Sequence, residues 1–218
     1  MPCRKFPVPL YLISCMTMEK SVEKIDLRER IIMEATILFQ AQGVKQVRMD
    51  DIARELSISK KTLYELFSDK EELLLEVLKV ISMGFHQNVK EIICSSTNVL
   101  EQIFMLYKWV IEHCREVNPL FFIELMRYPQ VQTFFEQVHV QHADRIKKWL
   151  QMGVKQGLLR DDVNYEVFLR QDGFQIDKLL INPEVRNYPP RVIYDSVVLV
   201  MLRGLATDKG LEIIKQWK

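Results

Sequence analysis

The sequence is poor in the residues that form turns, because only 7 Gly and 8 Pro occur among its 218 residues. A chain with few turns favours long helices over many short strands. Its four cysteines, at positions 3, 15, 94 and 114, form no CxxC pair, which favours free thiols in a reducing compartment. The sequence has no run of about 18 apolar residues, so no segment is predicted to span a bilayer. The net charge is only +1, so any attraction to nucleic acid must be local.

The N-terminal segment differs from the rest of the chain. Two basic residues precede a short apolar stretch that ends at Cys15, as in a bacterial lipoprotein signal. Pro7 and Pro9 would break the helix that such a signal needs, and the apolar run is near the lower length limit. We therefore expect residues 1–18 to be a disordered or non-native extension, with an export signal as the alternative.

Two amphipathic stretches follow. Apolar residues recur at helical spacing over residues 27–42, which predicts a helix that begins at an acidic capping box, Asp26 and Glu29, and ends at Gly43. A second, much shorter apolar stripe begins at Met49 and covers barely two turns. It carries acidic residues in its first turn, where the helix dipole favours negative charge.

A third short helix is predicted over residues 60–67, with Ser59 as its cap. A fourth begins after a predicted capping box of Ser68 and Glu71. Two short helices joined by a tight turn describe a helix-turn-helix. Helices of this length persist only by packing on one another, so we expect this head to present its third helix rather than to enclose a cavity.

These residues resemble the DNA-binding head of the tetracycline-repressor (TetR) family of bacterial regulators. The resemblance is carried by GVKQVRMDDIA at 43–53, LSISKKTLY at 56–64, Phe67, and DKEEL at 69–73. The rest of the chain resembles the family only in being helical and of the usual length.

Three positions depart from the family pattern. Arg48 replaces the Ser or Thr that commonly caps the second helix, and Ser57 replaces the Gly of the turn. Leu66 replaces a frequent His or Tyr and removes a phosphate contact. The first departure gives up a cap and the second requires a strained turn, but none removes the motif.

The resemblance implies which residues bind double-stranded DNA. Lys60, Lys61 and Thr62 would enter the major groove, where lysine donates to guanine and the threonine methyl group meets thymine. Phosphate contacts are implied at the positions Tyr64, Arg48 and Lys70. The alternative for the paired lysines is a solvated helix end, but cations are unfavourable at a helix start, which favours the functional interpretation.

The body is expected to be helical over 69–93, 98–116, 119–128, 130–156, 163–181 and 189–206, so the predicted class is all-α. The expected domains are a head at 19–68 and an effector-binding and dimerisation body at 69–218. Aromatic and Met side chains with a few polar groups suit an adaptable pocket for a small apolar or amphipathic effector, and they suit an ordinary core equally. The candidate pocket residues are His86, Phe104, Tyr107, Trp109, His113, Phe121, Phe122, Glu124, Met126 and Gln175.

Catalysis has no visible basis in the sequence, and no cofactor is predicted. Glu136, His139 and His142 could place three metal ligands on one helix face, but no second Glu-x-x-His completes a di-iron arrangement. Nucleophile and phosphate-binding motifs are also absent. A helical metal-dependent enzyme is therefore a distant alternative.

Near the C-terminus, residues 197–202 leave almost no polar face, so this helix must be covered on two sides. Two copies of it and of the preceding helix could form an intermolecular four-helix bundle, and the alternative is a helix wholly inside one chain. The candidate dimer residues are Phe174, Val197, Val198, Met201, Leu202 and Leu205.

Together these features predict a cytoplasmic, bacterial, homodimeric repressor that a small molecule releases from a palindromic operator. An architectural or nucleoid DNA-binding protein without an effector is the alternative.

Overall fold

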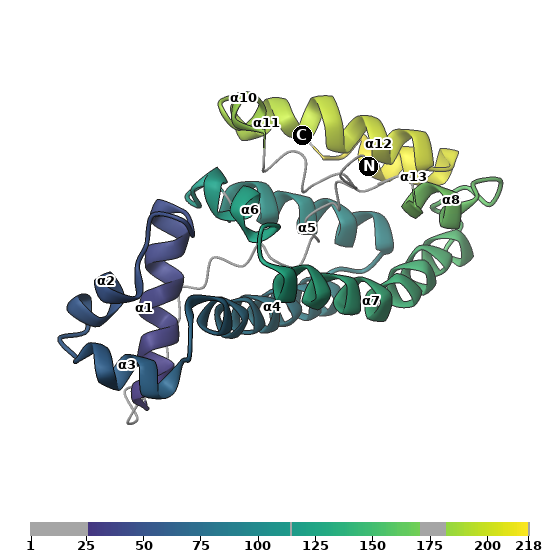
Figure 1. Ribbon diagram of the computed structural model, residues 1–218. Coiled ribbons are helices and arrows are strands. Elements are labelled where there is room, and N and C mark those ends of the chain that lie inside the picture. The colour runs from purple at the N-terminus through teal and green to yellow at the C-terminus, as the bar shows by residue number, and fades with distance from the viewer. Residues whose placement is uncertain (1–25, 114, 171–181, 218) are drawn as a thin grey trace, which may run out of the picture. The chain divides into compact units, whose positions relative to one another are not determined.

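The computed structural model describes residues 26–113, 115–170 and 182–217 (Figure 1). Within these ranges every regular element is a helix, and the one extended contact is an isolated antiparallel bridge between Leu159 and Ala206. The predicted all-α class is confirmed. No helix in the described ranges is long and apolar enough to cross a membrane. The predicted extension at residues 1–18 lies outside the described residues.

The helices in chain order are α1 (Leu27–Gln42), α2 (Met49–Glu55), α3 (Lys60–Leu66), α4 (Lys70–Ser95), α5 (Val99–His113), α6 (Pro119–Leu125), α7 (Pro129–Lys155), α8 (Tyr165–Arg170), α10 (Pro183–Arg186), α11 (Pro190–Ile193), the π-helix η2 (Tyr194–Val198), α12 (Leu199–Leu205) and α13 (Asp208–Ile214).

Within the described residues the predicted helices agree with these bounds to within a few residues, with two additions. Residues 171–181 of the helix predicted at 163–181 lie outside the described residues. The stretch expected at 189–206 is helical but contains the π-turn η2, which sequence periodicity does not reveal. The short helices α10 and α13 were not expected. Asn182 caps α10 by accepting the N–H of Glu184 at 3.0 Å, and Thr207 caps α13 by accepting the N–H of Gly210 at 3.2 Å.

Two predicted capping boxes are wrong in detail. The side chain of Asp26 makes no capping hydrogen bond at α1. At α4 the cap is displaced by one residue, since Asp69 accepts the N–H of Glu72 at 2.9 Å and the carboxylate of Glu72 accepts from Ser68. Glu71 instead accepts the N–H of Gln130 at 2.9 Å, a tertiary contact that spacing along the chain cannot show.

The chain divides into two compact units. The first comprises the residues up to His86 together with His113–Glu136, and the second comprises Gln87–Glu112 and the residues from Gln137 onward. These bounds differ from two consecutive domains divided at residue 69, because α4 up to His86, α6 and the start of α7 all belong to the first unit.

The core of the first unit lies where α1, α2, α3 and α6 meet. Helix α1 packs against α2 and α6, and α2 packs against α3. Phe39 of α1, Ile52 of α2 and Leu63 of α3 are fully buried, as is Phe67 after α3. The two short helices of the predicted helix-turn-helix therefore depend on α1 for their apolar burial.

In the second unit, buried polar groups are paired between elements. Gln102 of α5 is buried, and its side chain accepts the indole N–H of Trp149 at 2.6 Å and donates to the carbonyl of Ile93 at 3.2 Å. Helix α13 docks through its cap, because the N–H of Thr207 donates to the carbonyl of Leu158 at 3.0 Å. These bonds satisfy groups that burial would otherwise leave without partners.

The docking of α13 leaves no room for a side chain at Gly210. A Cβ atom there would lie 2.4 Å from the carbonyl oxygen of Leu158, which the Thr207 hydrogen bond holds in place. We expect Gly210→Ala to destabilise the protein by about 1–3 kcal/mol in chemical denaturation, although alanine is the better helix former. Glu212→Ala, which removes an exposed ion pair on the same helix, should change stability by less than about 0.5 kcal/mol. Equal stability of Gly210→Ala and the wild type would contradict this packing.

Candidate functional site

The turn between α2 and α3 is closed by backbone hydrogen bonds. The N–H of Ile58 donates to the carbonyl of Ala53 at 2.9 Å, and the N–H of Ser57 donates to that of Arg54 at 3.0 Å. Ser57 has a φ of 53°, in the left-handed region that favours glycine. The strained turn expected from the replacement of glycine at this position is confirmed.

Helix α3 begins at the predicted cap. The Oγ of Ser59 accepts the N–H of Thr62 at 3.0 Å and lies 2.8 Å from the Thr62 hydroxyl. The cap replaces a missing intrahelical partner in a helix of seven residues. It also fixes the side chain of Thr62 at the first turn, beside the two lysines.

The two lysines at the start of α3 differ in their surroundings. The ammonium group of Lys60 forms an ion pair with the carboxylate of Asp50 on α2. Lys61 has an 87% exposed side chain, and the carboxylate of Glu65 lies 3.8 Å from its Nζ. A solvated pair of this kind contributes little, so Lys61 is available to an external anion or acceptor. Tyr64 is also exposed, one turn further along α3.

At the start of α2, Asp51 compensates for the absence of a Ser or Thr cap at Arg48. Its carboxylate accepts the backbone N–H of Arg48 at 2.9 Å and the guanidinium of Arg54 at 2.8 Å. The hydrogen bond from Arg48 lowers the pKa of Asp51, burial opposes this shift, and Arg54 lowers the pKa further. The side chain of Arg48 is exposed.

Lys70 is bound inside the first unit. Its ammonium group donates to the carbonyl of Val47 and lies 5.7 Å from the centre of the Phe39 ring. Burial lowers the pKa of Lys70, while the carboxylates of Glu124 and Asp51 raise it. The predicted phosphate contact would therefore compete with an existing hydrogen bond between the start of α4 and the loop before α2.

Glu124 of α6 holds the loop between α1 and α2. It is only 6% exposed, and its carboxylate accepts the backbone N–H of Lys45 at 2.6 Å. Gly43, with a φ of 85°, allows this approach, because a Cβ there would lie 3.0 Å from Leu120 and 3.2 Å from the Glu124 carboxylate. Asn118 adds a hydrogen bond from its backbone N–H to the carbonyl of Gln40 at 2.7 Å.

The candidate pocket residues fall into both compact units. Phe121, Phe122, Glu124, Met126, His86 and His113 belong to the first, and Phe104, Tyr107 and Trp109 to the second. Phe121 and Phe122 are buried edge to face at 5.4 Å. The buried Tyr107 donates its hydroxyl to the sulfur of Met201 at 3.6 Å. Gln175 lies outside the described residues.

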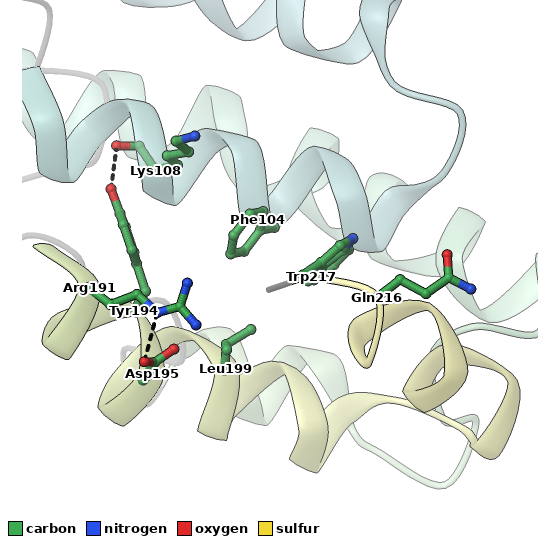
Figure 2. Close-up of a pocket in the computed structure, with 8 residues that line it drawn as sticks. All are labelled: Phe104, Lys108, Arg191, Tyr194, Asp195, Leu199, Gln216 and Trp217. Atoms are coloured by element: carbon green, nitrogen blue, oxygen red, sulfur yellow. Dashed lines mark hydrogen bonds and ion pairs between the residues drawn. The ribbon is translucent and has the colours of Figure 1, made fainter.

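A cavity of about 280 Å³ lies in the second unit (Figure 2). Of the candidate pocket residues, only Phe104 lines it. The lining residues are Phe104, Lys108, Arg191, Tyr194, Asp195, Leu199, Gln216 and Trp217. They come from α5, from the helical run that contains η2, and from the segment after α13.

Sequence reasoning did not identify seven of these eight residues. Arg191, Asp195 and Leu199 recur every four residues, which is ordinary on any helix, and Trp217 follows the last described helix. Lys108 lies one turn after Phe104 on α5, and this spacing was the one available signal.

The candidate dimer residues divide between two faces. Val198, Leu202 and Leu205 are buried within their own chain, and the sulfur of Met201 accepts a hydrogen bond from the hydroxyl of Tyr107. Val197 is exposed, and so are Val192 and Val200 of the same apolar stretch, which are not among the candidate dimer residues. We call Val192, Val197 and Val200 the valine face. Phe174 lies outside the described residues.

Comparison with known proteins points to one family. Residues 31–77 match the model of bacterial regulatory proteins of the tetR family. An HTH-type transcriptional regulator of Staphylococcus aureus is 29% identical, over 80% of this chain and 96% of that protein. The HTH-type transcriptional repressor KstR2 of Mycolicibacterium smegmatis is 27% identical, over 84% and 92%.

Among solved structures, a transcriptional regulator from Saccharomonospora viridis in complex with choline superposes with a TM-score of 0.68. It is 23% identical, and the match covers 83% of this chain and 97% of that one. This likeness shows a shared fold.

The contact between Glu124 and Lys45 generates a stability prediction. Glu124→Ala leaves the part-buried N–H of Lys45 without its acceptor, so we expect a loss of about 1–3 kcal/mol in chemical denaturation. Glu124→Gln keeps an acceptor oxygen, so it should lower the free energy of unfolding by less than Glu124→Ala does. Glu116→Ala, at an exposed position before α6, is the control and should stay within about 0.5 kcal/mol of the wild type. A neutral Glu124→Ala would contradict the role of this carboxylate.

Proposed function

Because this chain belongs to the TetR family of bacterial regulatory proteins, we propose that it represses transcription by occupying a pseudo-palindromic operator as a homodimer. A small-molecule effector then releases it from the DNA. The observation that carries this proposal is the start of α3, where Lys60, Lys61 and Thr62 lie together. This helix is capped by Ser59, and one of its sides is buried in the first unit. We place the protein in the cytoplasm with its DNA, in a non-catalytic role.

The charge at α3 supports a DNA-binding role over a purely structural one. Lysines at a helix start oppose the helix dipole and so do not stabilise α3. Lys61 is almost fully exposed and contributes little to the packing of the head. The major groove offers guanine acceptors to such a side chain, so DNA binding explains the presence of Lys61 where folding does not.

Asp50 adds a refinement to this interface. Its ion pair holds the ammonium group of Lys60 at the junction of α2 and α3. A lysine restrained in this way loses less conformational entropy when it meets a base edge than a freely rotating one. Phosphate contacts are assigned to Arg48 and Tyr64, whose side chains are exposed, and Lys70 remains a candidate.

The valine face supports a homodimer. Val192, Val197 and Val200 lie on the α11–η2–α12 run, and Val200 is 59% exposed. The opposite side of this run is already buried through Val198, Leu202 and Leu205. A second copy related by a two-fold axis would cover the same face on both chains and would present two α3 helices to two half-sites.

The cavity of the second unit supports an effector-responsive regulator over an architectural protein. An architectural protein needs no cavity lined by both aromatic and charged side chains. A ligand that binds one conformation of the dimer better than another would shift the population away from the one that fits DNA.

The DNA proposal predicts that selection from random duplexes will return a pseudo-palindrome. Lys61→Ala or Thr62→Ala should change the preference at particular base positions by about 1–3 kcal/mol. Arg48→Ala should weaken all sequences alike and reduce the slope of binding against salt by about one. Lys90→Ala, exposed on the C-terminal part of α4, is the control and should change neither property. Selection that returns no symmetric motif would refute the operator proposal.

The dimer proposal predicts that Val200→Glu and Val197→Glu yield folded monomers with weakened operator binding, as measured by light scattering and gel shift. A charge in a covered apolar face is left without a partner. Val198→Glu should unfold the chain instead, because Val198 is buried in its own unit. Met83→Glu, at an exposed apolar site on α4, should remain dimeric. A wild type that is monomeric at micromolar concentration, yet binds palindromic DNA tightly, would exclude the dimer.

A further inference from the structure

The cavity of the second unit has an aromatic wall. The rings of Phe104 and Trp217 stack with centroids 4.6 Å apart and an interplanar angle of 22°. The ring of Tyr194 lies 6.2 Å from that of Phe104 and tilts toward it. Leu199 closes the same wall from α12. Planar apolar groups pack favourably on such a wall, by stacking or edge-to-face contact.

Two of the three charged side chains that line the cavity are cationic. Arg191 and Lys108 carry positive charges, and Asp195 is the one carboxylate among the lining residues. Asp195 is already engaged, because it accepts the Nε–H of Arg191 at 2.9 Å. In Figure 2 the guanidinium of Arg191 points toward the space between Tyr194, Phe104 and Leu199.

The ion pair between Arg191 and Asp195 leaves the two terminal nitrogens of the guanidinium as a donor edge, which we call the Arg191 edge. Asp195 uses the Nε of Arg191, so the two terminal nitrogens can donate in parallel to a ligand. Two parallel donors match the two oxygens of a carboxylate. The hydroxyl of Tyr194 is held away from this edge, because it donates to the carbonyl of Lys108 at 3.2 Å.

The local backbone supports the same arrangement. Arg191 belongs to α11, while Tyr194 and Asp195 belong to the π-helix, in which the N–H of Leu199 bonds to the carbonyl of Tyr194. A π-turn widens the helix by one residue and is found frequently at functional sites. Here it lies beside the aromatic wall and the Arg191 edge.

From these contacts we propose that the cavity binds a small planar carboxylate, such as a single-ring aromatic acid, and that the effector belongs to this class. The assignment of the effector to this class rests on the proposed repressor function. The volume of about 280 Å³ lies just below the range of about 300–1,000 Å³ usual for larger ligands, so it suits one ring and one acid group. The carboxylate lies on the Arg191 edge and the ring lies against Phe104 and Trp217.

Calorimetry on the full chain tests the site with benzoate, with neutral benzamide and with cationic benzylamine. We expect benzoate to bind and the two other probes to bind at least about tenfold more weakly, because neither can accept both guanidinium bonds. Arg191→Gln should weaken benzoate binding at least about tenfold, and Arg191→Lys should do so less. Trp217→Leu should weaken benzoate and benzamide alike, because it removes the stacked ring.

Arg203→Gln provides the matched control, since Arg203 is exposed on α12 and does not line the cavity. It should leave benzoate binding unchanged, and circular dichroism should show that all variants are folded. Equal binding of benzoate and benzamide would overturn the carboxylate class. An equal effect of Arg191→Gln and Arg203→Gln, or no binding of benzoate at millimolar concentration, would overturn the site.

The operator selected from random duplexes separates the two halves of the proposal. Benzoate that binds the wild type and weakens operator binding, but has no effect on DNA binding by Arg191→Gln, supports the effector class. Benzoate that binds without changing operator affinity overturns the effector class while the repressor function stands. Failure to select any operator would count against the repressor function, and calorimetry would still decide on the site.

Discussion

The buried carboxylate of Glu124 is the constraint on which the DNA-binding head depends. It accepts the N–H of Lys45, at the point where the chain leaves α1 and turns toward α2. The same α6 is joined to the end of α1 through Asn118. Since α2 and α3 are too short to be stable alone, their position follows that of α1 and of this loop. A helix from later in the chain thereby fixes where α3 lies.

Several charges around α2 and α3 are arranged in pairs that serve folding. Asp51 satisfies the start of α2, and Asp50 restrains Lys60. Lys70 is held by the carbonyl of Val47. Lys61 takes part in no comparable contact with the body of the head and is almost fully exposed. The arrangement suits a surface that must be rigid in its backbone and still offer donors to a duplex.

The second unit combines closely packed positions with a cavity. Gln102 and Gly210 tolerate few substitutions. The side chain of Gln102 is needed as a hydrogen-bond partner for Trp149, and a backbone oxygen leaves no space for a side chain at Gly210. The cavity lies where α5 and the run containing η2 carry aromatic and charged side chains. The α11–η2–α12 run has one face buried in its own unit and its valine face exposed. The proposed ligand and the proposed second copy would therefore both contact this run.

The sequence by itself determined the local structure: the helix class, the turn at Ser57, the Ser59 cap and the set of residues at the start of α3. These follow from periodicity, capping chemistry and glycine preference, which act over a few residues. Only the tertiary structure decided that Glu124 binds a backbone amide in the head, and that Val198 is buried while Val200 is exposed. The tertiary structure alone showed that the rings of Phe104 and Trp217 stack on each other. Spacing along one helix says which residues share a face, but which partner covers that face depends on segments distant in the chain.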